Sequence, residues 1–183
     1  AVLAGCGLGR SPGCDGLVRR LLDLPRPLVL DADGINALSG HIDLLDARRG
    51  RPTVLTPHEV EFARIGGDLS RGDRERAAQD FAMAHGCVLV LKGHRTVTAS
   101  PEGDVLVNTT GGSGLAKGGS GDVLTGVIAS LMAQRADALR AAAVGVWLHG
   151  RAGDLAEQEL TAYSVTPEDV VRKLPDAIRE ILE

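Results

Sequence analysis

The stretch Asn108–Leu131, NTTGGSGLAKGGSGDVLTGVIASL, contains six glycines between Gly111 and Gly121. Asp122 follows directly, and apolar residues then recur at helical spacing at positions 123, 124, 127, 128, 131 and 132. The pattern predicts a flexible loop that leads into the N-terminus of a helix. Free backbone N–H groups and the helix dipole make such a terminus an anion site, and glycine lets a phosphate approach the backbone closely.

A carboxylate beside an anion site repels phosphate, so Asp122 needs a reason to be there. It could remove a proton from an attacking hydroxyl group or act together with a metal ion. The alternative is that Asp122 only caps the helix. The density of glycine favours a functional role, because a cap alone does not require it.

The glycine loop is neither of the two common phosphate-binding loops. A Walker A motif requires Gly-Lys-Ser/Thr, whereas Lys117 follows Ala116 and precedes Gly118. The dinucleotide fingerprint G-x-G-x-x-G also fails, because Gly7-x-Gly9 is followed by Pro12 where the third glycine would stand.

Composition limits the classes of function. The chain of 183 residues is long enough for one domain with a real core. Its formal charge of −4 and its 2% aromatic content argue against nucleic acid or an anionic membrane as a partner, and no apolar run is long enough to span a membrane. The three cysteines, Cys6, Cys14 and Cys87, are scattered and predict free thiols in the cytoplasm.

Short Val- and Leu-rich runs alternate with helical patterns. We expect strands at residues 1–4, 27–30, 53–55, 88–91, 96–99 and 105–107. We expect helices at residues 13–22, 36–45, 59–65, 74–85, 123–133, 138–158 and 167–182. The alternation predicts an α/β fold with a mostly parallel sheet covered by helices on both faces. Ser100–Gly103 has the chemistry of a hairpin turn, so one part of the sheet should be antiparallel.

The motif residues follow consecutive strands. Gly5–Gly9 follows the first strand, Asp31 the second, Thr56–His58 the third and Lys92–Gly93 the fourth. Ligands of parallel α/β sheets bind at the carboxyl ends of the strands. We therefore expect these residues to lie close together.

Five segments in order resemble the ADP- or ATP-dependent NAD(P)H-hydrate dehydratases. AKGGSGDVLTG is similar to the family signature A-[TK]-G-G-[ST]-G-D-V-L-[AT]-G. The other four are AGCGLGRSP (family pattern near GPGLG), LVLDADGINAL, TVLTPHEVEFARI (family TPHPGEF) and VLVLKGHRTVTASPEGDVLVN. The resemblance runs from about Ala1 to about Gly150. It implies a ribokinase-like three-layer αβα sandwich that repairs hydrated nicotinamide cofactors.

The resemblance also implies roles for single residues. Asp122 would be catalytic, and the hydrated cofactor would bind to Gly7, Gly9, His58 and Asp122. The adenine nucleotide would bind to Lys92, Gly93, His94, Arg95 and Thr96 and to the loop glycines Gly118, Gly119 and Gly121. The partners would be hydrated NAD(P)H and ADP, or ATP in its place, with Mg²⁺ as cofactor. Homo-oligomers, often tetramers, are common among the relatives.

Several alternatives stay open at this stage. Asp31 and Asp33 either cap the next helix or hold Mg²⁺, and His58 either caps a helix or binds a ligand. Cys6 stands where the family often has proline, which loosens the turn but leaves its glycines, and Glu59-Val60 replaces the family's Pro-Gly, which adds a negative charge near the site.

Two other functions also stay open, a ribokinase-like kinase for a sugar or a pyrimidine or thiazole precursor and an inactive nucleotide-binding fragment. The family domain usually has further elements before its GPGLG loop. We therefore expect residues 1–183 to form this domain without its N-terminal part.

Overall fold

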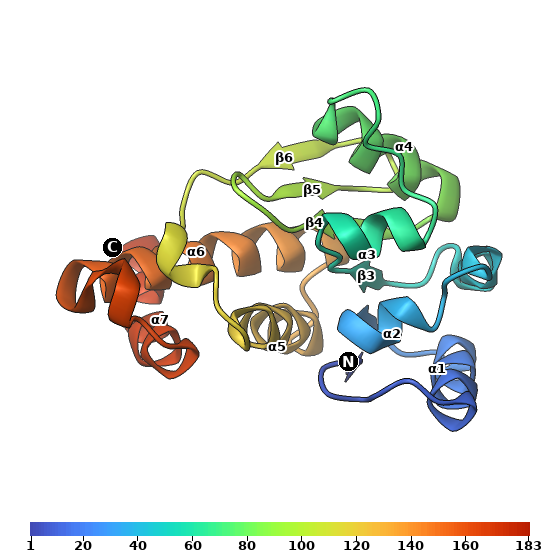
Figure 1. The fold of residues 1–183 in the computed structure, drawn as a ribbon, viewed down its shortest axis with the longest axis horizontal. Helices are drawn as coiled ribbons and strands as arrows, with labels where there is room; N and C mark the ends of the chain where they lie inside the picture. The colour runs from blue at the N-terminus through green and yellow to red at the C-terminus, as the bar shows by residue number, and fades with distance from the viewer.

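The computed structural model describes residues 1–183 and contains one sheet of six strands in the order β1-β2-β3-β4-β5-β6 (Figure 1). The first four strands pair in parallel, and β5 and β6 are added antiparallel. Their bounds are Val2–Ala4, Leu28–Leu30, Thr53–Leu55, Val88–Leu91, Val97–Ala99 and Val105–Val107. All six predicted strands and the hairpin are confirmed.

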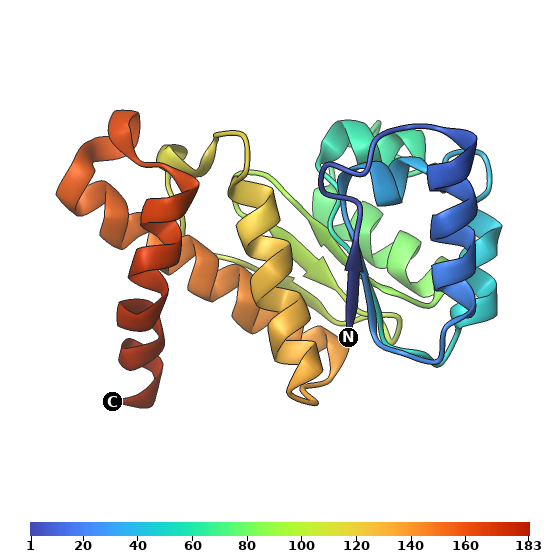
Figure 2. The same ribbon diagram turned by 90° about the horizontal axis from the view of Figure 1, so that it is seen from below.

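Helices cover both faces of the sheet, and Figure 2 shows α1 and α5 on opposite sides of it. The helices are α1 (Pro12–Asp23), α2 (Ala32–Asn36), the 3₁₀ helix η1 (Ile42–Arg48), α3 (Glu59–Arg64), α4 (Arg74–His85), the 3₁₀ helix η2 (Ser113–Leu115), α5 (Ser120–Ala133), α6 (Ala138–Ser164) and α7 (Pro167–Leu182). The predicted three-layer α/β architecture is confirmed. None of these helices combines the length and the apolar character needed to cross a membrane.

One predicted helix is wrong. Residues 36–45 do not form a continuous helix, because α2 ends at Asn36 and η1 begins only at Ile42. Between them Gly40 has φ +73°, a left-handed conformation that a right-handed helix cannot contain. Two other helix boundaries differ by more than one residue: α5 begins at Ser120, three residues before the predicted start, and α6 continues to Ser164 across a non-helical Thr161.

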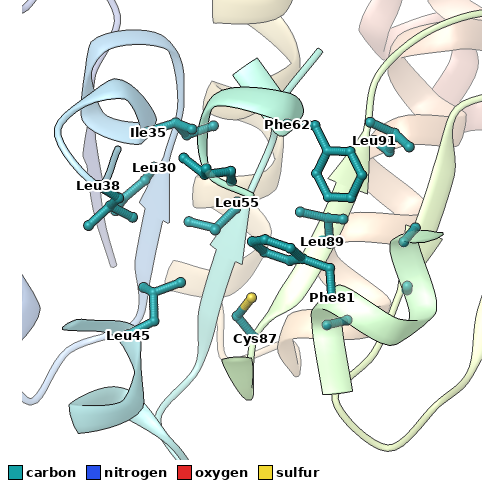
Figure 3. Packing of buried hydrophobic residues seen from close by; sticks show 14 of the residues in the cluster. Leu30, Ile35, Leu38, Leu45, Leu55, Phe62, Phe81, Cys87, Leu89 and Leu91 are labelled. Carbon is teal, nitrogen blue, oxygen red and sulfur yellow. The ribbon is translucent and has the colours of Figure 1, made fainter. Parts of the chain in front are cut away.

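One face of the sheet is built from leucines. Leu28 and Leu30 of β2, Leu55 of β3 and Leu89 and Leu91 of β4 point toward α1, α3 and α4. Figure 3 shows Phe62 and Phe81 in this layer. Their rings pack edge-on, with the ring centroids 5.2 Å apart. The alternation follows from the strand period of two, which sends every second residue to the same face.

The opposite face is built from valines. Val29, Val54, Val88 and Val90 pack against α5 and α6. The two helices also approach each other closely, because a Cβ at Gly145 would lie 2.7 Å from a side-chain carbon of Ile128. Gly145 therefore lets α6 pack closely against α5 and helps to hold α5 in place.

A buried arginine joins the end of α1 to the start of β3. Arg48 is 1% exposed. Its guanidinium donates hydrogen bonds to the carbonyl oxygens of Leu22, Leu24 and Arg26 at 2.8 to 3.0 Å and to Thr53 Oγ1 at 2.8 Å. Leu22 is in the last turn of α1, and Leu24 and Arg26 lie in the connection between α1 and β2. Arg48 thus satisfies buried acceptors that would otherwise destabilise the fold.

We expect Arg48→Met to lower the free energy of unfolding by about 3 kcal/mol, because the buried Thr53 hydroxyl and Leu22 carbonyl and the part-buried carbonyls of Leu24 and Arg26 lose a charged donor. Urea unfolding monitored by circular dichroism measures the change. Arg140→Met is the matched control, since the Arg140 side chain is 84% exposed, and it should change stability by less than about 0.5 kcal/mol. Equal stability of the two variants would contradict this role of Arg48.

Candidate functional site

An ion pair lies at the carboxyl edge of the sheet. Asp31 follows β2 directly and Lys92 follows β4, and Lys92 Nζ donates to Asp31 Oδ1 at 2.7 Å. The Asp31 side chain is 2% exposed and that of Lys92 is 20% exposed. Asp31 stands at the N-cap position of α2, but its carboxylate makes no capping hydrogen bond. The capping interpretation of Asp31 is therefore wrong, because the carboxylate is paired with Lys92.

The glycine loop closes over this ion pair. The N-cap of α5 is Gly119, with φ +89°, a conformation that favours glycine. A Cβ at Gly121 would lie 3.4 Å from Lys92 Nζ and 3.6 Å from Asp31 Oδ2. The positive end of the α5 dipole therefore lies directly beside the ion pair, as the sequence predicted for an anion site.

Asp122 lies in the first turn of α5 and is exposed. The helix has no side-chain cap at its N-terminus, so the capping alternative for Asp122 is also wrong. One carboxylate oxygen of Asp122 lies within 4.8 Å of both an Asp31 carboxylate oxygen and Cys6 Sγ. Two carboxylates therefore lie close together: that of Asp31 is buried and paired with Lys92, and that of Asp122 is open to solvent.

Cys6 is the member of this group whose place beside the carboxylates was not predicted. Its Sγ lies 3.7 Å from Thr125 Oγ1 and 3.8 Å from Asp31 Oδ2. Burial, reinforced by the neighbouring carboxylates of Asp122 and Asp31, raises the pKa of the thiol to about 11. Cys6 is therefore a neutral thiol at neutral pH. Its position between Gly5 and Gly7 was the available signal, since a turn of that kind brings the intervening side chain to the strand ends.

The oxygen atoms of this cluster fit Mg²⁺. This ion takes oxygen ligands and is often held by one or two carboxylates together with substrate phosphates. Asp122 and Oδ2 of Asp31 could supply two such oxygens, while Asp31 Oδ1 accepts the hydrogen bond from Lys92. The neutral thiol of Cys6 is a poor ligand for so hard a cation. Asp31 and Asp122 are therefore the residues that would hold the metal ion.

His58 lies at the N-cap of α3, beside Lys92. The two residues form a parallel bridge, with the Lys92 N–H donating to the Pro57 carbonyl at 2.8 Å. His58 Nδ1 accepts hydrogen bonds from the backbone N–H groups of Val60 and Glu61. His58 does cap its helix, and this arrangement requires the ring proton on Nε2.

Glu61 completes the capping box and orients the histidine ring. Its Oε2 accepts from the His58 N–H at 2.9 Å, and its Oε1 lies 3.3 Å from His58 Nε2. The Glu61 side chain is 7% exposed, whereas that of His58 is 51% exposed. Glu61 therefore orients the His58 ring, and the ring keeps an exposed edge that a ligand could reach.

The turn Gly5–Gly9 forms the other side of the site. A Cβ at Gly5 would lie 1.7 Å from the Asp31 carbonyl oxygen, so only glycine fits there. The Gly9 N–H donates to Asp33 Oδ2 at 2.9 Å. Hydrogen bonds from Arg10 and Gly9 hold the pKa of Asp33 below its usual range. Asp33 therefore anchors the turn and, unlike Asp31, takes no part in the carboxylate cluster.

The predicted nucleotide stretch is divided in the structure. Lys92 points into the cluster, whereas Gly93, His94 and Arg95 are exposed at its rim. Thr96 Oγ1 donates to the Gly93 carbonyl at 3.1 Å and closes the turn. The structure brings together Lys92, Gly121 and Asp122 but keeps residues 94–96 further out.

His149 supports the glycine loop from beneath. Its Nε2 lies 3.3 Å from the hydroxyl of Ser120, the first residue of α5, and both side chains are buried. Burial lowers the pKa of His149 to about 4, with a small further contribution from the charge of Lys92. The ring is therefore neutral at neutral pH. Neither His149 nor Ser120 belongs to a motif that the sequence marks as functional, because their contact crosses 29 residues of chain.

Known proteins resemble this chain over most of its length. The chain matches the family model described as Carb_kinase, NAD(P)H-hydrate dehydratase, over residues 1–176. The bifunctional NAD(P)H-hydrate repair enzyme Nnr of Gloeobacter violaceus is 44% identical over 169 residues, which cover 92% of this chain and 33% of that protein. The ADP-dependent (S)-NAD(P)H-hydrate dehydratase of Neisseria meningitidis is 41% identical over 164 residues, covering 86% of this chain and 55% of that protein.

A solved structure has the same fold. The ADP/ATP-dependent NAD(P)H-hydrate dehydratase of Bacillus subtilis, co-crystallised with ATP and Mg²⁺, is 32% identical and superposes with a TM-score of 0.82. The similarity covers 97% of this chain and 63% of that chain. The present chain thus spans about a third to about two thirds of the length of these relatives.

We expect Lys92→Met to lower the free energy of unfolding by about 3 kcal/mol, because it leaves the buried Asp31 carboxylate without its ammonium partner. Adding Asp31→Asn should recover most of this loss, since the second change removes the unpaired charge. Urea unfolding of the wild type, both single variants and the double variant measures the coupling. If the losses of unfolding free energy in the two single variants add up to that of the double variant, Lys92 and Asp31 do not stabilise each other.

His149 predicts an acid-sensitive fold. A histidine whose pKa is near 6.5 when unfolded and about 4 when folded binds its proton more readily in the unfolded chain. Stability should therefore fall as the pH drops from about 6.5 to 4, by up to about 3 kcal/mol from this residue. His149→Gln can keep the contact to Ser120 without titrating. The difference in unfolding free energy between wild type and variant should shrink as the pH falls; a difference that does not depend on pH would refute the assignment.

Proposed function

Because this chain belongs to the NAD(P)H-hydrate dehydratase family, we propose that it dehydrates hydrated NADH and NADPH with ADP or ATP as the co-substrate. The observation that carries the proposal is Asp122. Its carboxylate follows the glycine loop, makes no cap and lies beside the Lys92–Asp31 pair. An exposed acid at an anion-binding helix terminus is suited to take a proton from a hydroxyl group as that group attacks a phosphoryl group.

Two groups of residues would bind the two substrates. The hydrated nicotinamide ring would lie between the Gly7–Gly9 turn, the exposed edge of His58 and Asp122. The adenine nucleotide would lie along Lys92–Thr96, with its phosphates at the N-terminus of α5 near Gly118, Gly119 and Gly121. The close approach of Gly121 to Lys92 supports this placement, because the ammonium and the backbone N–H groups face the same space.

The proposed chemistry converts the ring hydroxyl, a poor leaving group, into a phosphate ester, whose phosphate is a good one. Asp122 takes the proton of the ring hydroxyl while that oxygen forms a bond to the terminal phosphorus of the nucleotide, and the bond from phosphorus to the leaving phosphate oxygen breaks. The loop N–H groups and Lys92 stabilise the charge on the transferring group. Asp31 and one oxygen of Asp122 would hold Mg²⁺ to screen the nucleotide phosphates, which leaves the other oxygen of Asp122 to accept the proton.

Elimination completes the reaction. The carbon–oxygen bond of the phosphate ester breaks with its electron pair on the departing phosphate, as the ring nitrogen donates its lone pair. Loss of a proton from the adjacent ring carbon then restores the double bond of NAD(P)H. With ADP the products are AMP and phosphate. The names of the relatives, ADP-dependent in one case and ADP/ATP-dependent in the other, support either donor.

Two wider expectations are part of the same proposal. We place the protein in the cytoplasm, which agrees with three free thiols at Cys6, Cys14 and Cys87. We also expect a homo-oligomer, with a tetramer as the first state to test by analytical ultracentrifugation.

Absorbance at 340 nm tests the function. Mixing the protein with hydrated NADH, Mg²⁺ and ADP or ATP should restore the NADH absorbance, and the faster nucleotide names the donor. Asp122→Asn should lower the rate by at least about a hundredfold, because it removes the base without changing the shape of the side chain. Asp176→Asn, an exposed acid on α7, is the control and should be as active as the wild type. Accumulation of a phosphorylated ring without elimination would instead indicate a kinase.

A further inference from the structure

A surface cavity of about 370 Å³ lies beside the Gly5–Gly9 turn, between the start of α1 and the end of α2. Its polar lining consists of Arg10, Ser11, Asp15, Asn36, Ser39 and Arg64. The mechanism above uses none of these residues. Two of them are arginines from different elements that border the same cavity, Arg10 in the loop before α1 and Arg64 at the end of α3.

Helix α2 holds each of the two guanidinium groups by one edge. Arg10 Nε donates to Asp33 Oδ1 at 3.2 Å, and Arg64 Nη1 donates to Asn36 Oδ1 at 3.1 Å. Asn36 Nδ2 in turn donates to Asp33 Oδ1 at 3.3 Å, which joins the two supports. Both terminal nitrogens of Arg10, and Nε and Nη2 of Arg64, make no hydrogen bond in the structure. Two oriented guanidinium groups therefore keep free donors next to an open cavity.

We propose that Arg10 and Arg64 bind a phosphate group of the hydrated dinucleotide substrate, an inference that rests on the proposed function. Asp33, which holds Arg10, also accepts the hydrogen bond of Gly9 at 2.9 Å. The arginines are thus tied to the turn assigned to the hydrated ring. The rest of the dinucleotide has to extend away from that turn. This cavity lies beside it and offers planar guanidinium groups, whose N–H donors suit a phosphate.

The phosphate could be the diphosphate bridge or the 2′-phosphate that distinguishes NADPH from NADH. The hydroxyl groups of Ser11 and Ser39 could donate further hydrogen bonds to either. Asp15 is the only acid in the lining, and its charge opposes an anion there. Removing an arginine charge should therefore weaken substrate binding, whereas removing the Asp15 charge should strengthen it.

The experiment measures kcat and KM for hydrated NADH and hydrated NADPH at saturating ADP. Arg10→Met and Arg64→Met should each raise KM roughly tenfold and change kcat less than twofold, because they remove binding that is equal in the ground and transition states. A rise for both substrates would identify the diphosphate as the bound group. A rise for hydrated NADPH alone would identify the 2′-phosphate.

Matched variants exclude a general effect of charge. Asp15→Asn should lower KM about two- to threefold, and Arg140→Met, an exposed arginine paired with Asp137, should leave KM unchanged. Normal turnover with unchanged KM in both Arg10→Met and Arg64→Met would refute this inference alone. Absence of turnover in the wild type would refute the proposed function, and this inference with it.

Discussion

The ion pair between Lys92 and Asp31 is the interaction on which the site depends. Its members come from the ends of β4 and β2, with β3 between them, so the pair spans three strands. A carboxylate that is 2% exposed must be paired or it destabilises the fold. That requirement fixes the direction of Lys92, and the ammonium then faces the one stretch of backbone that can approach it closely, at Gly121.

The pair also separates the roles of two neighbouring carboxylates. Asp31 is buried, and the hydrogen bond from Lys92 to Oδ1 fixes the position of its carboxylate, so that only Oδ2 would be available to a cation. Asp122 is exposed and has no partner from a cap or a lysine. Different environments of this kind are how one site gives two acids different functions. In the proposed mechanism, Asp122 therefore takes the proton and Asp31 gives electrostatic support.

Most of the architecture could be predicted from the sequence, because its signals are local. Buried parallel strands are continuous runs of Val and Leu, and all six runs became strands. The carboxyl ends of such strands share an edge, so Asp31, His58 and Lys92 could be placed near one another before any coordinates were known. The helix predicted over residues 36–45 failed because periodicity gives no weight to a single left-handed glycine at Gly40.

The parts that could not be predicted depend on contacts between distant segments. The thiol of Cys6 meets Thr125 across 119 residues, and His149 meets Ser120 across 29. Local propensity carries no information about such pairs. The same holds for the ion pair, since either acid after β2 could have met Lys92. Only the burial of Asp31 and the use of Asp33 by the Gly9 turn distinguish the two.

The valine face has a consequence for how this protein can change over time. Helix α5 carries Asp122 at one end and Ile128 near its middle, and Ile128 is pressed against Gly145 of α6. A larger side chain at position 145 would push α5 along its whole length and shift the acid without touching it. Lineages that accumulate substitutions in this seam should therefore change positions 128 and 145 together, one growing as the other shrinks. Coupled substitutions at these two positions would then show that the contact between α5 and α6 holds Asp122 in place.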